Sequence, residues 1–462
     1  MDYDVIIIGG GPGGYVAAIR AAQRGLRTAL VERADLGGIC LNWGCIPTKA
    51  LLKSAQVYDD LSHAADYGIA LQGTASPDLA AIVARSRSVA AGMNKGVEYL
   101  MRSNGVTVVR GHGRVLPGRK VMVTTQNGIA TLQGRHVVLA VGARARELPG
   151  LPIDGTHVLG FRQAMTLGSV PASMAIVGAG AIGVEFAWFY ATLGTKVTLI
   201  EARDRIVPQE DAEVSKELER SFARRGIEVL TAAQVDGVTP GDGSTTLRVR
   251  VAGAERQIAC EVVLSAAGVR ANLEDLGLEA TSIATDAGKV VVDRWYRCSV
   301  DGYYAIGDCI AGPALAHVAS AEAIACIDRI AGVDAQAVDY GNIPSCTYAQ
   351  PEVASVGHTE QSAKDAGYEV RVGKFPFSAS GKAKAAGHAE GFVKLVFDAR
   401  YGVLLGAHMI GDHVTELVAE LVTARKLETT AEELARAIHP HPTMSEAVME
   451  AATAAFGAAV HL

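Results

Sequence analysis

The sequence predicts an α/β protein in which two similar strand–turn–helix units are followed by a separate C-terminal α+β unit. Three observations lead to this class: a glycine motif that occurs twice between strands and helices, a change to alternating strands beyond residue 341, and the composition. The 462 residues include 51 glycines, 49% hydrophobic and only 5% aromatic residues, a balance typical of globular α/β chains. At about three times a domain length of roughly 150 residues, the chain has room for several compact units.

Each of the two similar units reads strand, glycine turn, helix, strand, acid. The first consists of residues 5–8, then Gly9, Gly11 and Gly14, a helix to residue 23, a strand over residues 28–31, and Glu32. The second consists of residues 175–177, then Gly178, Gly180 and Gly183, a helix to residue 193, a strand over residues 196–200, and Glu201. The three glycines and the acid of the second unit each lie 169 residues after their counterparts in the first. This constant offset indicates a duplication.

A G-x-G-x-x-G motif in this context is the fingerprint of Rossmann-like dinucleotide binding. The glycines let the backbone approach a pyrophosphate, the helix N-terminus offers free N–H groups, and the acid accepts hydrogen bonds from a ribose. Two tight turns without ligands are the alternative. Two full fingerprints predict two dinucleotides.

The acid of the second unit also bears on the choice of nicotinamide cofactor. A carboxylate at Glu201 pairs with a free ribose 2′-hydroxyl and repels a 2′-phosphate, so NAD is expected rather than NADP. Arg203 and Arg205 follow it and could hold a phosphate, although surface arginines after a strand are the commoner case.

Charge and cysteine usage exclude several classes of function. The net charge of −6 comes without a lysine or arginine block, which argues against a nucleic-acid or polybasic membrane surface. No apolar run is long enough to span a bilayer, and no export signal is expected from the N-terminal residues. Seven cysteines, an odd number in a long chain, indicate a reducing cytoplasm rather than a disulfide framework.

Two of the cysteines, Cys40 and Cys45, form a close pair. Residues five apart in a regular helix are too distant for a disulfide, so a bridge requires irregular backbone, which Gly44 can supply. Pro47 suits the first turn of a helix, and such a helix would place Cys45 at its N-terminus, where a thiolate is stabilised. Two unrelated buried cysteines or half of a metal site are the alternatives. The remaining cysteines are scattered and are expected to be structural: Cys260, Cys298, Cys309, Cys326 and Cys346.

Residues 37–52 resemble the redox-active segment of the flavin-dependent pyridine nucleotide-disulfide oxidoreductases, and the resemblance extends over essentially the whole chain. It implies that the first glycine unit binds FAD and the second NAD. It also implies a disulfide beside the flavin, with Cys40 as the sulfur that meets a dithiol substrate and Cys45 as the sulfur that contacts the flavin. Lys49 would lie near the flavin, paired with Glu185. Trp43 departs from the small aliphatic residue usual at its place and is expected to narrow access to the disulfide.

The resemblance assigns further cofactor contacts. Asp308 follows a short strand over residues 303–306, and Val141 stands where the family commonly has a threonine, so one hydroxyl is missing there. The residues implied at FAD are Gly9, Gly11, Gly14, Glu32, Lys49, Gly113, Gly142, Asp308, Ala314, Leu315, Ala316 and His317. The residues implied at NAD are Gly178, Gly180, Gly183, Glu185, Glu201, Val235 and Gly268.

The C-terminal part, from about residue 341, combines alternating strands such as residues 391–397 with helices over residues 413–426 and 431–437. Near its end, His441 lies between two prolines, which restrict the backbone and suit a base held in one place. A surface turn or a weak metal pair with His439 is the alternative. The resemblance makes His441 the proton-transfer residue, Glu446 its orienting partner, and the active unit a homodimer.

The expected organisation is an FAD unit over residues 1–147, an NAD unit over 148–272, a segment over 273–340 that completes the FAD unit, and an interface unit over 341–462. The resemblance implies that NAD⁺ oxidises the dihydrolipoyl group of a 2-oxo-acid dehydrogenase or glycine cleavage complex. The implied partners are lipoyl domains and the E2 core of a 2-oxo-acid dehydrogenase complex. An NADPH-driven disulfide reductase, a flavoenzyme that passes hydride between nicotinamides, and a structural subunit of such a complex are the alternatives.

Overall fold

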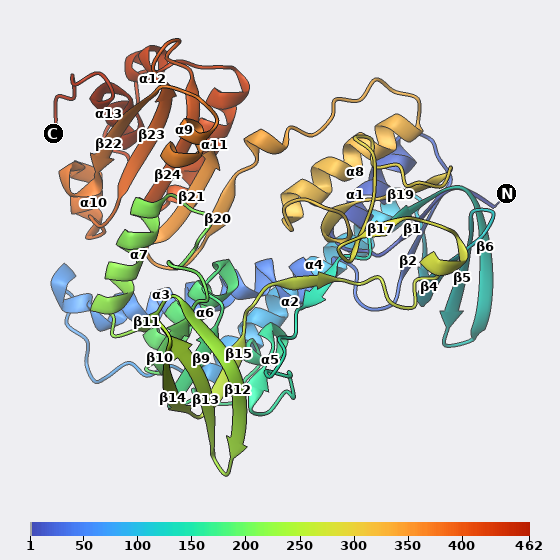
Figure 1. Cartoon of the computed structure of the whole chain (residues 1–462), viewed down its shortest axis with the longest axis horizontal. Helices are drawn as coiled ribbons and strands as arrows, with labels where there is room; N and C mark the ends of the chain where they lie inside the picture. Colours follow the sequence, from blue (N-terminus) through green and yellow to red (C-terminus); the bar gives the residue numbers. More distant parts are fainter. Residues whose placement is uncertain (1) are drawn as a thin grey trace.

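The computed structural model describes residues 2–462. Its first sheet combines strands from the N-terminal part of the chain with a strand that begins at Tyr303. Strands β1, β2, β3 and β19 all run parallel to their neighbours in this sheet, and β19 pairs with β6 although about 165 residues separate them. Figure 1 shows α8 beside α1 at this sheet. The parts of this first unit are β1 (Tyr3–Ile8), α1 (Pro12–Gln23), β2 (Thr28–Glu32), β3 (Thr107–Arg110), β4 (His112–Leu116), β5 (Lys120–Thr125), β6 (Gly128–Leu139), β19 (Tyr303–Ala305) and α8 (Ala316–Ile330).

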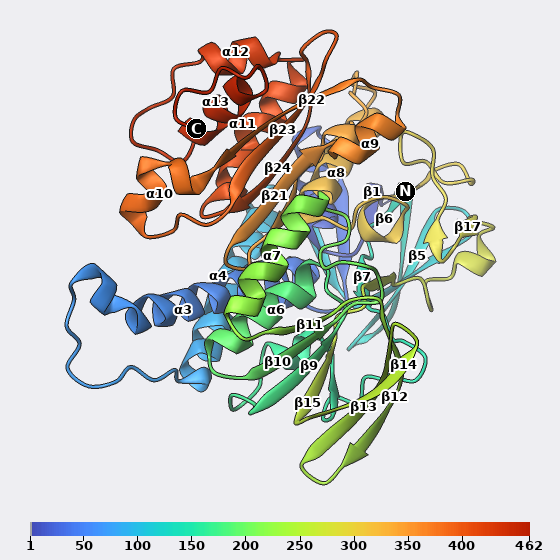
Figure 2. The same cartoon turned by 60° about the vertical axis from the view of Figure 1, so that its left-hand side comes forward.

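Three helices inserted after β2 carry the cysteine segment. Helix α2 (Gly38–Trp43) is followed by the long pair α3 (Cys45–Ser62) and α4 (Leu79–Ser103), which pack against each other. Figure 2 shows the connection between α3 and α4 projecting from the body of the molecule. The start of α3 packs against α6 of the second unit, so the cysteines lie where the two units meet.

The second unit is a parallel sheet in the order β11-β10-β9-β15-β8 with an antiparallel sheet of three strands beside it. Helix α6 (Ala181–Thr192) is buried on all sides from Gly183 to Tyr190, because it lies between its own sheet and α3. The other elements are β8 (Val158–Leu159), α5 (Phe161–Ala164), β9 (Ser173–Val177), β10 (Lys196–Ile200), α7 (Ala212–Arg224), β11 (Glu228–Leu230), β12 (Ala233–Gly241), β13 (Ser244–Val251), β14 (Ala254–Cys260) and β15 (Val262–Ser265).

The chain leaves the first unit and returns to it through two short strands. Strand β7 (Ala143–Ala145) pairs antiparallel with β16 (Val269–Ala271), so the outgoing and incoming segments lie side by side. A small hairpin of β17 (Thr285–Asp286) and β18 (Lys289–Val290) follows. These segments form the seam between the two units.

The C-terminal unit is an antiparallel sheet in the order β20-β21-β24-β23-β22, so the expected α+β unit is confirmed. Its expected first strand residue, Gly391, lies just outside β23 because its φ of +96° does not fit a strand, and His413 at φ +58° likewise precedes α11. The elements are β20 (Ser345–Thr347), β21 (Glu352–Gly357), α9 (Glu360–Asp365), β22 (Val370–Pro376), α10 (Gly381–Ala386), β23 (Phe392–Asp398), β24 (Leu404–Gly411), α11 (Val414–Lys426), α12 (Ala431–Arg436) and α13 (Glu446–Ala454).

A buried lysine ties the second unit to the C-terminal unit. Lys394 of β23 is only 2% exposed, and its ammonium group contacts Asp211 at 3.1 Å, Glu213 at 2.7 Å and Glu360 at 2.9 Å. Burial opposes the charge, but hydrogen bonds to Glu213 and Glu360 raise the pKa of Lys394. Figure 2 shows α7, which begins at these carboxylates, between the two sheets. The cluster therefore fixes α7 against the C-terminal sheet.

Removing this ammonium group is expected to destabilise the protein strongly. The Lys394→Ala change leaves Asp211, itself buried, without the cation it shares, so the free energy of unfolding should fall by about 3–5 kcal/mol. The matched control is Lys364→Ala, because Lys364 pairs with Glu360 at 2.6 Å from a half-exposed position and should change stability by less than about 0.5 kcal/mol. Urea unfolding of both variants gives the comparison, and equal losses would contradict the assignment.

Candidate active site

The first glycine turn is shaped so that only glycine fits. Gly9 has a φ of +104°, and a side chain there would run into the Ala140 carbonyl, while a side chain at Gly14 would overlap the Gly9 carbonyl. Gly11, in contrast, has no atom nearer to its open side than Gly38 Cα at 3.9 Å. The turn therefore leaves backbone space in front of the N-terminus of α1, where a pyrophosphate fits.

The second turn repeats this geometry. Gly178 also has a φ of +104°, a side chain at Gly183 would overlap the Gly178 carbonyl, and nothing lies within 4 Å of the open side of Gly180. The same close contacts exclude a side chain at the first and third glycines of both units, and the second glycine leaves the same open space in both. The space in front of α6 fits a second pyrophosphate.

The two acids at the strand ends also have matching surroundings. Glu32 accepts hydrogen bonds from the Gly10 amide at 2.6 Å and the Ala34 amide at 2.7 Å. Glu201 accepts them from the Ala179 amide at 2.8 Å and the Arg203 amide at 2.9 Å, donors that lie 169 residues after their counterparts. Both carboxylates are thus held beside their glycine turns, at the place where a ribose diol would reach them.

A substitution at the second turn is expected to separate the two dinucleotide sites. In Gly183→Ala, the added methyl group forces α6 away from Gly178. NAD-linked turnover should therefore fall at least about tenfold, which corresponds to a loss of only about 1.4 kcal/mol of binding free energy. Bound flavin should be retained. The control is Gly92→Ala in α4, where nothing lies within 4 Å. Turnover with NAD⁺ and flavin absorbance are measured on both variants, and flavin loss in Gly183→Ala would contradict the separation.

The cysteine segment contains the expected break in the helix. Helix α2 ends at Trp43, Gly44 has non-helical φ and ψ of −148° and −112°, and α3 starts at Cys45. Cys40 is half-buried and Cys45 exposed, and both are free thiols in the structure. The bend brings the two sulfurs together although a continuous helix would not.

The two thiols differ in acidity. A hydrogen bond from Cys40 lowers the pKa of Cys45 to about 7; partial desolvation of the sulfur opposes this shift, and the charge of Lys49 assists it. The same hydrogen bond, followed by burial, raises the pKa of Cys40. Cys45 is therefore the sulfur that carries negative charge near neutral pH.

The charge next to Cys45 comes from an ion pair that joins the two units. Lys49 Nζ lies 2.9 Å from both carboxylate oxygens of Glu185, as the sequence predicts. The Tyr348 amide donates to the same carboxylate at 2.9 Å, and its ring lies 4.3 Å from Lys49 Nζ. Glu185 is almost fully buried, so the lysine is held at one place rather than solvated.

A cavity of about 1160 Å³ extends from the first glycine turn to the cysteines. Its lining includes Cys40 and Cys45 together with almost all the residues expected at FAD, namely Gly9, Gly11, Glu32, Lys49, Gly113, Gly142, Asp308, Ala314, Leu315, Ala316 and His317. Gly14 does not line the cavity; it packs against the Gly9 carbonyl inside the turn. The shape and the open backbone at Gly11 suit a dinucleotide.

The residues expected at NAD lie mostly outside this cavity. Glu185 lines it, whereas Gly178, Gly180, Gly183 and Glu201 surround the second turn, Val235 lies on β12, and Gly268 lies just before β16. The two sets therefore occupy neighbouring places that meet at the Lys49–Glu185 pair.

The histidine expected as a base is in a well-defined hydrogen-bonded pair. His441 Nδ1 lies 2.9 Å from Glu446 Oε1, and the Thr443 amide donates to the other carboxylate oxygen at 2.9 Å. His439, by comparison, uses both ring nitrogens, toward Ala437 and Glu420. Within residues 2–462, Nε2 of His441 has no such partner, and the side chain is 78% exposed. His441 does not line the cavity, so one chain alone does not bring it to the cysteines.

The chain was compared with known proteins. Residues 3–323 match the family model of pyridine nucleotide-disulphide oxidoreductases, and residues 343–452 match the dimerisation domain of that family. The chain belongs to this family. Three similar proteins named dihydrolipoyl dehydrogenase are those of Rhizobium etli, 47% identical with 98% of both chains covered, of Zymomonas mobilis, 47% with 99% of both, and of Bacillus subtilis, 43% with 100% of this chain and 99% of the other.

Solved structures agree. LpdA from Mycobacterium tuberculosis superposes with a TM-score of 0.90 at 28% identity, covering 97% of this chain and 99% of that one. The flavoprotein disulfide reductase RclA from Escherichia coli gives a TM-score of 0.87 at 25% identity, covering 98% and 99%. The predicted family, the α/β fold, the class of flavoprotein disulfide oxidoreductase and the cofactors FAD and NAD are thus confirmed. Within residues 2–462, no helix is long and apolar enough to cross a membrane.

The structure shows the surroundings of the two departures from the family pattern. Val141 lacks the hydroxyl that is common at its place. Beside it, the side chain of Asn272 donates to the Val141 carbonyl at 3.0 Å, and the backbone amide of Asn272 donates to the Gly142 carbonyl. Trp43 lines the cavity, and the guanidinium groups of Arg87 and Arg162 lie 4.4 Å and 5.4 Å from the centre of its ring. Its expected effect on access to the disulfide stays a prediction.

Sequence reasoning missed several residues at this site. Tyr348 supports Glu185, and Cys346, expected to be only structural, is half-buried and lines the same cavity. Lys289 donates to the Asp308 carbonyl. None of the three stands in a local motif, so only knowledge of the tertiary contacts could have found them.

Proposed function

We propose that this enzyme oxidises the dihydrolipoyl group with NAD⁺ as the final electron acceptor. The observation that carries the proposal is the pair Cys40 and Cys45, with an acidic Cys45 beside the Lys49–Glu185 ion pair in the cavity that suits FAD. The relatives named dihydrolipoyl dehydrogenase, similar over nearly their full length, support the choice of substrate.

For the exchange between the substrate dithiol and the enzyme disulfide, the enzyme supplies one base and two cysteine sulfurs. The reaction starts from the oxidised enzyme, in which a disulfide bond joins Cys40 and Cys45. His441 takes a proton from one substrate thiol, and the thiolate attacks Cys40, so that a substrate–Cys40 bond forms while the Cys40–Cys45 bond breaks. Cys45 leaves as a thiolate, consistent with its lowered pKa of about 7. The second substrate thiol then attacks the substrate sulfur that is bound to Cys40, so the lipoyl disulfide forms while the substrate–Cys40 bond breaks. Cys40 leaves as a thiol that carries the proton of the second substrate thiol. Two electrons have moved from the substrate to the enzyme dithiol.

The residues of the two glycine units would hold the two cofactors. Bound FAD would supply an acceptor for the electron pair, and bound NAD⁺ would supply the final hydride acceptor. In our proposal the FAD-lining residues named above hold the flavin, with Gly14 shaping its turn. Gly178, Gly180, Gly183, Glu201, Val235 and Gly268 hold NAD, and Lys49 with Glu185 lies where both cofactors meet. Glu201 favours a free 2′-hydroxyl and thus NAD over NADP.

Assembly and location are proposed as follows. The chain contains the family's dimerisation domain, and in the proposed homodimer His441 with Glu446 serves the cysteines of the other subunit. The substrate is presented on a lipoyl domain bound to the E2 core of a 2-oxo-acid dehydrogenase complex in the cytoplasm. We propose unit boundaries at 147/148, 272/273 and 340/341, with residues 273–340 completing the FAD unit.

A paired assay tests this function. Purified flavin-containing enzyme is given NADH with lipoamide in one arm and NADPH with oxidised glutathione in the other. Turnover in the first arm, with little in the second, is expected. Turnover only in the second arm would overturn both the substrate and the cofactor preference.

A further inference from the structure

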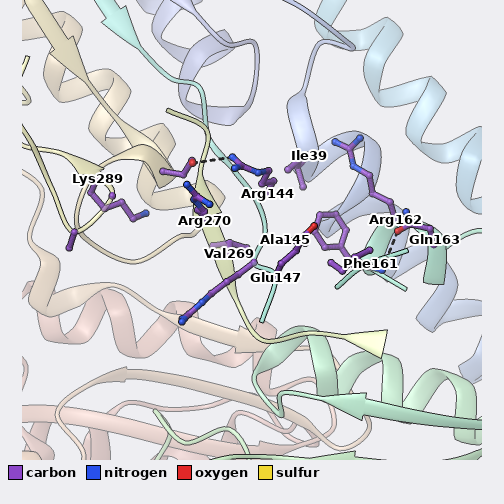
Figure 3. A pocket seen from close by; sticks show the side chains of 16 residues that line it. Ile39, Arg144, Ala145, Glu147, Phe161, Arg162, Gln163, Val269, Arg270 and Lys289 are labelled. Atoms are coloured by element: carbon purple, nitrogen blue, oxygen red, sulfur yellow. Dashed lines mark hydrogen bonds between the residues drawn. The ribbon is translucent and has the colours of Figure 1, made fainter. Parts of the chain in front are cut away.

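A second cavity, of about 760 Å³, opens at the seam between the first two units. It lies against β7 and β16, with α5 and the turn before β18 around it. Figure 3 shows Lys289, Arg270 and Arg144 on one side of this seam pocket and Phe161, Arg162 and Gln163 on the other. Its volume lies within the range of small-ligand sites, roughly 300–1000 Å³.

The lining of the seam pocket is strongly cationic. Five cations from four separate chain segments line it, namely Arg144, Arg146, Arg162, Arg270 and Lys289, against the single acid Glu147. Arg144 binds Glu274 with both nitrogens, at 2.8 and 2.7 Å, and Arg270 contacts the same carboxylate at 2.7 Å. Arg144 and Arg270 therefore share the single carboxylate of Glu274.

Two of these arginines have no anion of their own. Among residues 2–462, neither Arg146 nor Arg162 has a carboxylate within ion-pair distance. Burial, followed by the charge of Arg33, lowers the pKa of Arg162, so its positive charge is held at a cost. Like charges gathered in a concave site raise the local concentration of anions. The pocket is thus arranged for a ligand with more than one negative charge.

The seam pocket adjoins the large cavity, and the two share the lining residues Ile39, Arg144, Phe161, Arg162 and Val269. Arg146, Arg270 and Lys289 line the seam pocket alone, and neither the second glycine turn nor Glu201 lines it. The rest of its lining includes the polar side chain of Gln163 and the apolar side chains of Ile39, Ile153, Phe161 and Val269. An aromatic ring and aliphatic side chains beside cations suit a ligand with a planar apolar part as well as phosphates.

We propose that the seam pocket binds a nucleoside diphosphate in addition to the FAD and NAD of the two glycine turns. The phosphates lie between Arg146 and Arg162, and the base packs on Phe161. ADP is the probe for this chemistry. Pyrophosphate supplies the charge without the base, and adenosine supplies the base without the charge.

The test uses the full-length, flavin-containing enzyme with saturating NAD⁺, so that both known dinucleotide sites are filled. Isothermal titration with ADP at low salt should give one site per chain, with weaker binding of pyrophosphate and none of adenosine. Arg146→Gln should weaken ADP binding about tenfold, and Arg146→Glu should abolish it. Turnover with NAD⁺ should be unchanged in both variants, because only the backbone amide of Arg146, which both substitutions keep, contacts the NAD-assigned Gly268, and Arg146 does not line the large cavity.

The matched control is Arg436→Gln, since Arg436 is an exposed arginine of the C-terminal unit that pairs with Glu432 at 2.6 Å. It should bind ADP as the wild type does. No ADP binding at millimolar concentration, displacement of ADP by NAD⁺, or unchanged binding in Arg146→Glu would each overturn the proposal. Absence of dihydrolipoamide oxidation would contradict the proposed function instead, because the binding assay does not depend on turnover.

Discussion

Cys45→Ser is expected to lower dihydrolipoamide oxidation by at least about a thousandfold while FAD remains bound, as expected when a covalent catalyst is lost. The change removes the sulfur whose lowered pKa, about 7, makes it the leaving thiolate of the exchange. Serine has nearly the same size, and the turn at Gly44 and the cavity lining stay intact. Turnover with NAD⁺ and flavin absorbance of the same sample give the two measurements.

A second cysteine substitution makes this result specific. Cys298→Ser replaces a half-buried thiol whose pKa burial raises to about 12 and which does not line the cavity. Its turnover should stay within about twofold of the wild type, since it removes no reacting sulfur. Wild-type turnover in Cys45→Ser would exclude the disulfide mechanism, and loss of flavin there would show that the serine disturbs the cavity.

The duplicated glycine units could be predicted because their geometry is local. Gly9 and Gly178 have the same positive φ, and each lies close to a carbonyl oxygen. Only glycine, which has no side chain, fits at these two positions. The break at Gly44 is predictable for a similar reason, since the spacing of the cysteines excludes a continuous helix. Such demands involve only a few neighbouring residues and therefore leave a readable pattern.

The contacts that the sequence does not reveal join residues far apart in the chain. Lys394 meets Asp211 and Glu213 across about 180 positions, and no periodicity encodes which buried lysine finds which acid. The seam pocket likewise collects its cations from four segments that are unremarkable when taken singly. The roles of Asp308 and His441 could be predicted only from the resemblance to the family, because the local sequence around each residue is also compatible with a surface turn.

His441→Gln is expected to lower kcat/KM for dihydrolipoamide by about 10²–10⁴, the usual contribution of a general base. Glu446 engages Nδ1 of His441 at 2.9 Å and so leaves Nε2 to accept the proton of the substrate thiol. Glutamine keeps a polar side chain but cannot take up that proton. The control is His439→Gln, whose ring is hydrogen-bonded on both sides and should contribute little to catalysis.

Mixing two inactive variants tests whether His441 acts across the dimer. If His441 of one subunit serves the cysteines of the other, a mixed dimer of Cys45→Ser and His441→Gln chains has one site with both defects and one intact site. Subunit exchange in an equal mixture should then restore about a quarter of wild-type turnover, because half the dimers are mixed and each has one working site. If the residues act within one chain, every site retains a defect, and no activity returns.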